Sequence, residues 1–237
     1  MRKREIPAFT SALSKREAIL VLLYIPVHVA LLQLLLSHLA RIGTLSLPTA
    51  NLLYYAIGFV YMVAAGFGFL RRDFDPLADR PFFTLLEILS SYGWMFIANF
   101  IVGMLMLGLP EGTGTNPNNQ SIMNTAAMGS RYVEAAVVYL GPLVEEMMFR
   151  AGVFGLIRRK NRIAAYVASS LLFSLYHVLP YAIASPKNWI FLVQYLPVSF
   201  LLARCYERTN SIWGSTLFHM LVNGIAFSAL GVLQELM

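Results

Sequence analysis

Long apolar runs separated by short polar segments set the pattern of this chain of 237 residues. A run of about 20 apolar residues is long enough to cross a bilayer as a helix. The pattern therefore predicts an all-α, polytopic transmembrane bundle with spans at residues 18–40, 51–70, 83–109, 132–157, 163–183, 189–206 and 212–235. These make seven spans, or eight if the long third run or the Gly141-Pro142 pair in the fourth divides a span.

The polar segments predict how the chain is organised. Residues 1–17 form a basic, cytoplasmic N-terminus, and 18–109 form the N-terminal transmembrane helices. Residues 110–130 are rich in Gly, Pro and Asn and are expected to form an extracytoplasmic loop. Residues 131–237 then form the membrane core that carries the chemistry. The N-terminal segment has no short apolar region ending in a small-residue cleavage site, so no cleaved signal peptide is expected.

Composition and charge agree with a membrane protein. The chain is 58% hydrophobic and only 13% charged, and its mean hydropathy is +0.64. The net charge of +6 could suggest a nucleic-acid partner. However, 14 of the 18 Lys and Arg residues fall in segments on the same side as the N-terminus and three on the other. This asymmetry follows the positive-inside rule. It predicts a multi-pass protein of a bacterial-type plasma membrane with a cytoplasmic N-terminus, and the lipid bilayer, rather than nucleic acid, as a partner.

Three isolated polar or sulfur side chains lie within the predicted spans. The single cysteine, Cys205, excludes an internal disulfide framework and a Cys-rich metal site, and is expected to be a small apolar residue near a helix end. His28 and Glu87 are expected to make ordinary interhelical hydrogen bonds.

The fourth span carries an unusual concentration of charge. A charged residue at the centre of a bilayer costs about 2.5–3.5 kcal/mol, so three unpaired charges would cost on the order of 8–10 kcal/mol. Glu146 and Arg150 are four residues apart on one helix face and are expected to pair. Glu145 points about 100° away and has no partner on its own helix. A structural Glu-Arg clamp therefore explains Glu146 and Arg150 but leaves Glu145 for another role.

Three more polar residues fall at a similar depth in other spans. At a rise of about 1.5 Å per residue, Glu145 and His177 each lie roughly 20 Å from the N-terminal side of the membrane, and His219 and Asn223 lie roughly 12 and 18 Å from it. His219 and Asn223 share a helix face. We therefore expect these residues and the charged cluster to form one polar site inside the bundle.

Such a set suits the hydrolysis of an amide. A carboxylate beside an imidazole can activate water, and a second imidazole with a carboxamide can stabilise the oxyanion. Glu145, His177 and His219 could instead bind Zn²⁺ or another divalent metal with an open position for water. The sequence is consistent with both versions.

Other protease chemistries fit less well. The chain has no H-E-x-x-H motif, its three aspartates lie in one loop, and no G-x-S-G surrounds Ser215, which lies one turn from His219.

Three ordered motifs carry a family resemblance. Glu145-Glu146-x-x-x-Arg150, Phe173-x-x-x-His177 and His219-x-x-x-Asn223 resemble the motifs of the CPBP family. These are the CaaX proteases and bacteriocin-processing intramembrane endopeptidases, also called the Abi family. The resemblance covers about residues 130–226 and leaves the first three spans unassigned.

The resemblance implies a helical core, formed by the last four spans, that hydrolyses a peptide bond in a membrane-associated protein or peptide. By this resemblance Glu145 and His177 would activate water, and His219 and Asn223 would hold the oxyanion. Glu146 would support the site, and Arg150 would neutralise and orient it. The resemblance makes a metalloprotease as plausible as a glutamate-dependent enzyme.

Two alternatives come from other functional classes. A bacteriocin-immunity or regulatory protein of the same fold would bind a partner without catalysis and would tolerate Glu145→Gln. A small transporter would use the charged cluster as an ion relay, and would be expected to show paired repeats or broken helices in both halves. Only Gly141-Pro142 suggests a broken helix.

Overall fold

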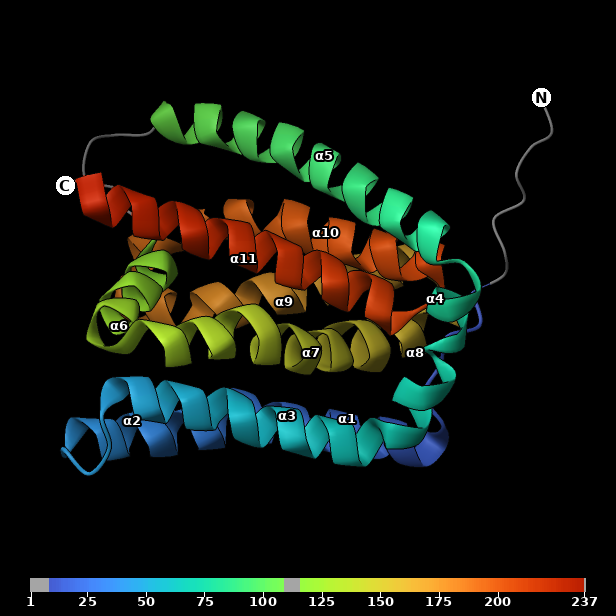
Figure 1. Ribbon diagram of the computed structural model, residues 1–237, viewed down its shortest axis with the longest axis horizontal. Helices are drawn as coiled ribbons and strands as arrows, with labels where there is room; N and C mark the ends of the chain where they lie inside the picture. Colours follow the sequence, from blue (N-terminus) through green and yellow to red (C-terminus); the bar gives the residue numbers. More distant parts are fainter. Residues whose placement is uncertain (1–8, 109–115, 237) are drawn as a thin grey trace.

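A computed structural model describes residues 9–108 and 116–236, without the side chains of 126–130 and 230–236. All regular structure in these residues is helical. The helices run roughly side by side in three layers (Figure 1). Their bounds are α1 Lys15–Pro26, α2 Gln33–Arg41, α3 Leu47–Arg72, α4 Asp75–Asp79, α5 Pro81–Leu107, α6 Pro117–Glu134, α7 Gly141–Glu146, α8 Gly155–Arg158, α9 Arg162–Ala184, α10 Leu192–Thr209 and α11 Ile212–Leu236.

Several of these helices join into longer rods. The π-helical segment Val27–Leu32 links α1 to α2, and the 3₁₀ segment Pro186–Phe191 leads into α10. The π-helical segments Ala135–Leu140 and Met147–Phe154 link α6, α7 and α8. We call the stretch Gly141–Gly155 the central helix.

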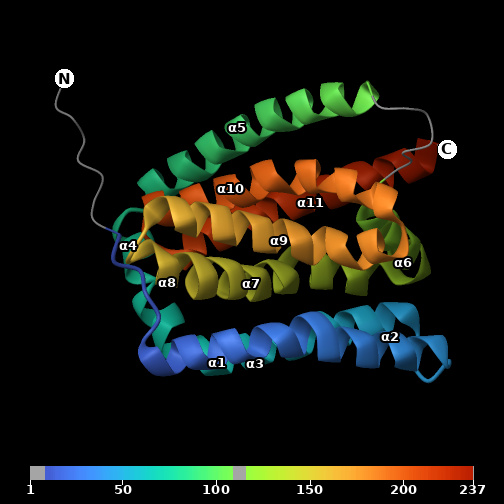
Figure 2. The same cartoon turned by 180° about the vertical axis from the view of Figure 1, so that it is seen from behind.

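The central helix forms the middle of the bundle. Each of its 15 residues is buried, as expected for a helix enclosed by others on all sides. The pair α1–α2 and α3 form one outer layer, α5 forms the opposite one, and α9, α10 and α11 lie between them (Figure 1). From behind, α9 and α1 come to the front (Figure 2). The central helix is therefore within reach of side chains from several neighbours.

Glycines let α3 approach its neighbours closely. A Cβ at Gly58 would lie 2.9 Å from Cε1 of His28, and a Cβ at Gly66 would overlap the side-chain methyl of Met147. Small residues have this role at many helix contacts in membranes. Through them α3 brings its tyrosines toward the middle of the bundle.

Five helices are long and apolar enough to cross a membrane: Lys15–Arg41, Leu47–Arg72, Pro81–Leu107, Arg162–Ala184 and Pro186–Thr209. They coincide with five of the predicted spans. The fourth and seventh predicted spans are helical but are not among these five, so the count of seven or eight spans stays a prediction. The chain is an all-α, multi-pass membrane protein.

The predicted loop 110–130 differs from the structure. Residues 110–115 lie outside the described part, and α6 begins at Pro117. The Asn116 side chain caps this helix by accepting a hydrogen bond of 3.0 Å from the backbone N–H of Asn118. A proline in the first turn after an Asn cap is a good helix start. The turn-forming residues Pro117, Asn118 and Asn119 therefore begin a helix.

One end of the bundle is rich in arginine. We call it the basic end; it carries α4, the start of α1 and the end of α10 (Figure 1). Glu207 contacts Arg158 and Arg162 there, and Glu87 contacts Arg204 at 3.5 Å and Arg208 at 2.5 Å. The contacts of Glu87 join α5 to α10, as expected of an interhelical polar residue.

His28 differs from its expectation. Neither ring nitrogen has a hydrogen-bond partner among the described residues. The ring instead stacks on Tyr54 with centroids 4.1 Å apart. Cys205 is a free, buried cysteine in α10.

A second polar cluster ties the chain together at the basic end. Asn210 ends α10 in the left-handed conformation with φ of 55°. Its side-chain oxygen accepts hydrogen bonds from the backbone of Thr10 and Ser11 at 2.8 and 3.0 Å. The carboxylate of Asp73 accepts from the Ser11 hydroxyl and from the backbone N–H of Ile212, the first residue of α11. These bonds fix where α11 begins.

Candidate active site

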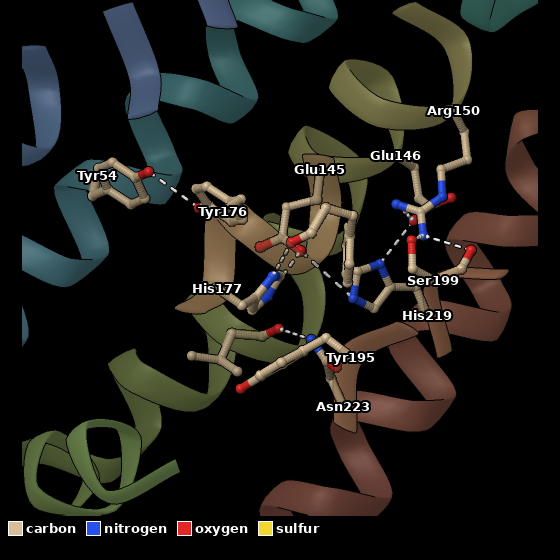
Figure 3. A network of polar contacts seen from close by, with 12 residues as sticks. Tyr54, Glu145, Glu146, Arg150, Tyr176, His177, Tyr195, Ser199, His219 and Asn223 are labelled. Atoms are coloured by element: carbon tan, nitrogen blue, oxygen red, sulfur yellow. Dashed lines mark hydrogen bonds and ion pairs between the residues drawn. The ribbon is translucent and has the colours of Figure 1, made fainter. Parts of the chain in front are cut away.

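The central helix presents the charged cluster to α9, α10 and α11 (Figure 3). Glu146 and Arg150 form an ion pair of 3.3 Å, and neither side chain is exposed. Arg150 also donates to the backbone oxygen and the hydroxyl of Ser199 in α10, at 3.3 and 3.2 Å. Its guanidinium lies 4.3 Å from the centre of the Phe173 ring. The predicted intrahelical pair is thus present and is held by two further helices.

His219 of α11 joins this pair. Its Nδ1 lies 3.0 Å from Oε1 of Glu146, the same oxygen that faces Arg150. A carboxylate paired with arginine is ionised and accepts hydrogen bonds, so Nδ1 of His219 carries the hydrogen. The other ring nitrogen, Nε2, then faces Oε2 of Glu145 at 3.7 Å.

His177 of α9 approaches Glu145 in the same way. Its Nδ1 donates to the backbone oxygen of Phe173 at 2.9 Å, because a carbonyl can only accept. Its Nε2 faces Oε2 of Glu145, also at 3.7 Å. In their neutral forms both imidazoles therefore present a lone pair to the same carboxylate oxygen.

That oxygen is one of four buried polar atoms of the site without a hydrogen-bond partner among the described residues; the others are Oε2 of Glu146 and Nε and Nη1 of Arg150, which belong to the ion pair. Glu145 is 4% exposed, and its Oε2 has no hydrogen-bond partner among the described residues. Buried polar atoms nearly always have a partner, and an unpartnered one needs an explanation. A small molecule that donates hydrogens, such as water, complements three acceptors that converge in this way.

Asn223 lies one turn beyond His219 on α11. Its side-chain Nδ2 donates to the backbone oxygen of Val137 at 2.9 Å, in the turns that precede the central helix (Figure 3). The structure thus brings five of the six predicted site residues into one network of polar contacts. It holds the sixth, Asn223, beside that network through a backbone contact.

The residues proposed as metal ligands do not form a recognisable metal site. Among the described residues no group of three or more His, Cys, Asp and Glu side chains is placed to hold a metal ion. The ligand types of Glu145, His177 and His219 nevertheless suit zinc. Zinc binding by these three residues stays a prediction.

The tyrosines around Glu145 were not predicted from the sequence. The hydroxyls of Tyr54 in α3 and Tyr176 in α9 are 3.1 Å apart, and Tyr195 in α10 stacks on His177. Tyr176 directly precedes His177 and lies inside the motif Phe173-x-x-x-His177. Its place in this motif was the signal that could have pointed to it. Nothing in the pattern of the second span distinguished Tyr54, because helix rotation is not visible in an apolar run.

An apolar cavity of about 750 Å³ lies between α3 and α11, and its lining includes none of the six predicted site residues. At one end it is lined by Leu143 of the central helix and by Met220, which follows His219. At the other end it reaches Arg71 and Trp213 at the basic end. The cavity therefore extends from the central helix toward the basic end.

Comparison with known proteins identifies the core. Residues 128–225 match the family described as type II CAAX prenyl endopeptidase Rce1-like. This stretch contains all six predicted site residues. No solved structure matches the chain significantly.

Curated relatives agree with this match. The chain is 25% identical over 178 residues to UPF0177 protein YxdF of Lactococcus lactis, covering 74% of this chain and 92% of YxdF. It is 36% identical over 76 residues to UPF0177 protein YajF of the same organism, covering 32% and 33%. It is 25% identical over 143 residues to the membrane-embedded CAAX protease MroQ of Staphylococcus aureus.

The match to MroQ covers 57% of this chain and about half, 54%, of MroQ. The family match and this relative both lie within the membrane proteases. Over residues 128–225 the chain is therefore similar to the Rce1-like family of type II CAAX prenyl endopeptidases.

Proposed function

We propose that this chain is an intramembrane endopeptidase in which Glu145 and His177 activate water to hydrolyse a peptide bond of a membrane-associated substrate. One observation carries the proposal. Oε2 of Glu145 is buried without a hydrogen-bond partner in the part of the chain that the structure describes, and the Nε2 atoms of two imidazoles face it at 3.7 Å each. A purely structural carboxylate would be expected to have its hydrogen bonds satisfied.

In the proposed reaction a water molecule donates one hydrogen to Oε2 of Glu145 and the other to Nε2 of His177. Glu145 takes a proton as the water oxygen attacks the carbonyl carbon of the substrate. The C–N bond of the tetrahedral intermediate then breaks, and Glu145 returns the proton to the leaving amine. The bond from His177 Nδ1 to Phe173 keeps Nε2 of His177 pointing into the site.

His219 and Asn223 are the proposed oxyanion donors. The amide of Asn223 has two hydrogens, and the bond to Val137 uses one of them. His219 donates from Nε2 only when its ring is doubly protonated. The Glu146 carboxylate, 3.0 Å from Nδ1, stabilises that charged form. Arg150 in turn keeps Glu146 ionised and in place.

The apolar cavity supports a membrane-associated substrate. It lies against the central helix at Leu143 and against α11 at Met220, and it is lined mainly by aromatic and aliphatic side chains. The apolar part of a membrane-anchored peptide fits such a lining. We further propose that the protein lies in the plasma membrane with its basic end in the cytoplasm, because arginine and lysine gather on the cytoplasmic side of bacterial membrane proteins.

The test is cleavage of a library of membrane-anchored peptides by purified protein in lipid nanodiscs. Wild type is compared with Glu145→Gln and His177→Ala, each with and without a chelator. Glu134→Gln is the matched control, because Glu134 is an exposed glutamate in the same helical rod. Cleavage that is lost in both site variants and kept in the control supports the proposal.

The proposal is overturned if none of the four proteins cleaves any peptide and the two site variants still fully rescue the phenotype of a deletion strain. Loss of cleavage on chelation, restored by Zn²⁺ alone, would place a metal at Glu145, His177 and His219. Persistence of cleavage in chelator favours the glutamate mechanism.

A second candidate is a non-catalytic membrane protein that acts by binding a partner, as in bacteriocin immunity. The observation that favours it is the match to YxdF and YajF, whose names state no activity. This candidate predicts that Glu145→Gln keeps the biological effect of the protein, whereas the protease predicts that it abolishes that effect.

A further inference from the structure

Three aromatic rings pack around the imidazole of His177, and Figure 3 labels two of them, Tyr176 and Tyr195. Phe173 and Tyr176 belong to the same helix, with ring centroids 4.5 and 4.9 Å away. Tyr195 comes from α10 and stacks on the imidazole at 4.6 Å with an angle of 25° between the rings. Only Tyr195 of these three holds the ring from a different helix.

Tyr195 is itself anchored from a third direction. Its hydroxyl oxygen accepts a hydrogen bond of 3.2 Å from Nδ2 of Asn116. The same Nδ2 donates to Oε1 of Gln194 at 2.6 Å, so the two amide hydrogens of Asn116 reach two adjacent residues of α10. The Oδ1 atom of Asn116 caps α6. The start of α6 is thereby tied to the face of α10 that meets His177.

The direction of the His177 ring matters for the proposed reaction. The bond from Nδ1 to Phe173 fixes one edge of the ring but leaves it free to tilt. A tilt would move Nε2 relative to Oε2 of Glu145, from which it is 3.7 Å away. A displacement of about 1 Å at a reacting group can cost on the order of a hundredfold in rate. The stacked ring of Tyr195 blocks that tilt.

We propose that Tyr195, held by Asn116, is a positioning residue that keeps Nε2 of His177 directed at Glu145. The inference rests on the proposed function, in which His177 binds the attacking water. Tyr195 touches neither Glu145 nor Glu146 by any described hydrogen bond or ion pair. It acts through the imidazole that it covers.

Variants separate the ring from its anchor. Tyr195→Leu removes the stacked ring and is expected to lower kcat about tenfold or more with little change in KM. Tyr195→Phe keeps the ring and loses only the hydroxyl, so most of kcat should return. The Tyr195 hydroxyl also donates to Oδ1 of Asn116 at 3.5 Å, so Asn116→Ser is used: its short hydroxyl can still cap α6, but it lacks the amide that contacts Tyr195, and it should behave like Tyr195→Phe.

A double-variant cycle tests the anchor directly. If Asn116 acts on the site through the Tyr195 hydroxyl, Asn116→Ser should add no further loss of kcat to Tyr195→Phe. If the losses of kcat are fully additive, Asn116 does not act through the Tyr195 hydroxyl. This conclusion holds even if Tyr195→Leu fails to fold. Tyr132→Leu is the matched control, because Tyr132 is 64% exposed and its removal should leave kcat unchanged.

A spectroscopic readout keeps this inference separate from the proposed function. Nitrogen NMR of isotope-labelled histidine, with His177 assigned by His177→Gln among the four histidines, reports the tautomer and mobility of the ring. Wild type should show one ordered ring with hydrogen on Nδ1. Tyr195→Leu should broaden or shift that signal, whether or not cleavage has been found.

An unchanged His177 signal in Tyr195→Leu overturns the positioning role. A loss confined to KM would also overturn it, because Tyr195 would then be a substrate contact. If the signal changes but no protein cleaves any peptide, the proposed function fails while the positioning of His177 by Tyr195 stands.

Discussion

Glu207 and Glu145 are both buried carboxylates of the same bundle, with exposures of 5% and 4%. Glu207, at the basic end, contacts Arg158 and accepts hydrogen bonds of 2.8 Å from both Arg162 and Tyr166. Glu145, in the central helix, has an oxygen with no hydrogen-bond partner among residues 9–108 and 116–236, and two imidazoles lie 3.7 Å from it. The exposed fractions of the two side chains are nearly equal. Both oxygens of Glu207 accept hydrogen bonds, whereas Oε2 of Glu145 accepts none from the described residues.

The difference separates two uses of a buried charge. A carboxylate whose hydrogen bonds are all made holds helices together, and here Glu207 joins α8, α9 and α10. A carboxylate left unsatisfied opposes folding, because its desolvation is not compensated. Such a group is expected where chemistry requires it, since active sites commonly trade stability for function.

Glu145→Gln should produce the largest effect. Removing a general base lowers the rate by about 10²–10⁴-fold, and the amide should leave thermal stability unchanged or higher because it removes an unsatisfied charge. Initial cleavage rates and thermal unfolding in nanodiscs measure the two effects. If the variant is stable and cleaves at the wild-type rate, Glu145 is a structural carboxylate like Glu207 and not a general base.

Arg150→Met should give the largest loss of stability. It leaves Glu146 as an uncompensated charge with no exposure, and breaking a buried pair in this way costs about 3–5 kcal/mol. The double variant Glu146→Gln/Arg150→Met should recover much of that loss. Denaturant titration of both proteins is the measurement. Equal stability of the two variants would show that the pair is not the source of the effect.

Glu207→Gln should reverse the pattern of Glu145→Gln. The loss is expected to be about 1–3 kcal/mol, because the arginines that it pairs with are partly exposed and can be solvated. The cleavage rate of the protein that remains folded should be kept. Rates normalised to the folded fraction check this. A selective loss of rate would mean that the basic end contributes to the chemistry.

Asp73→Asn should give the smallest effect, visible in its dependence on pH. Burial raises the pKa of Asp73 from 3.8 to about 6, against the opposing hydrogen bonds from Ile212 and Ser11 and the charge of Arg72. The folded protein therefore binds this proton more tightly than the unfolded chain does. The contribution of Asp73 to stability is present below about pH 4 and is lost as the pH rises to about 6.

Asp73→Asn removes the titrating carboxyl and with it this pH-dependent contribution to stability. Unfolding temperatures of both proteins at pH 4.5 and pH 7 provide the test. Wild type should gain stability relative to Asp73→Asn at the lower pH. A gain at the higher pH would contradict the sign.

Five long helices were predicted well, because each is an apolar run of nearly its own length. The pair Glu146–Arg150 followed from spacing within one helix, and His177 and His219 from their depth. The catalytic roles of these residues stay proposals. The count of spans also stays a prediction, because the fourth and seventh predicted spans are not among the five helices that are long and apolar enough to cross a membrane.

The remaining differences concern contacts that a one-dimensional pattern does not contain. The rotation of α3 decides that Tyr54 faces Tyr176, and the packing of α10 on α9 decides that Tyr195 covers His177. Pro117 and its neighbours favour turns, yet Asn116 caps a helix there. Contacts between helices settled each of these cases.

Cys205 is the single cysteine of the chain, and it is buried in α10 without a disulfide. Thiol reagents need an accessible thiolate, so the folded protein should remain unlabelled. A cysteine placed at exposed Thr44, or at exposed Ala78 on the basic end, would then be the only reactive site. Maleimides that do not cross bilayers, applied to intact cells, would report which end faces outward without any change to the native sequence elsewhere.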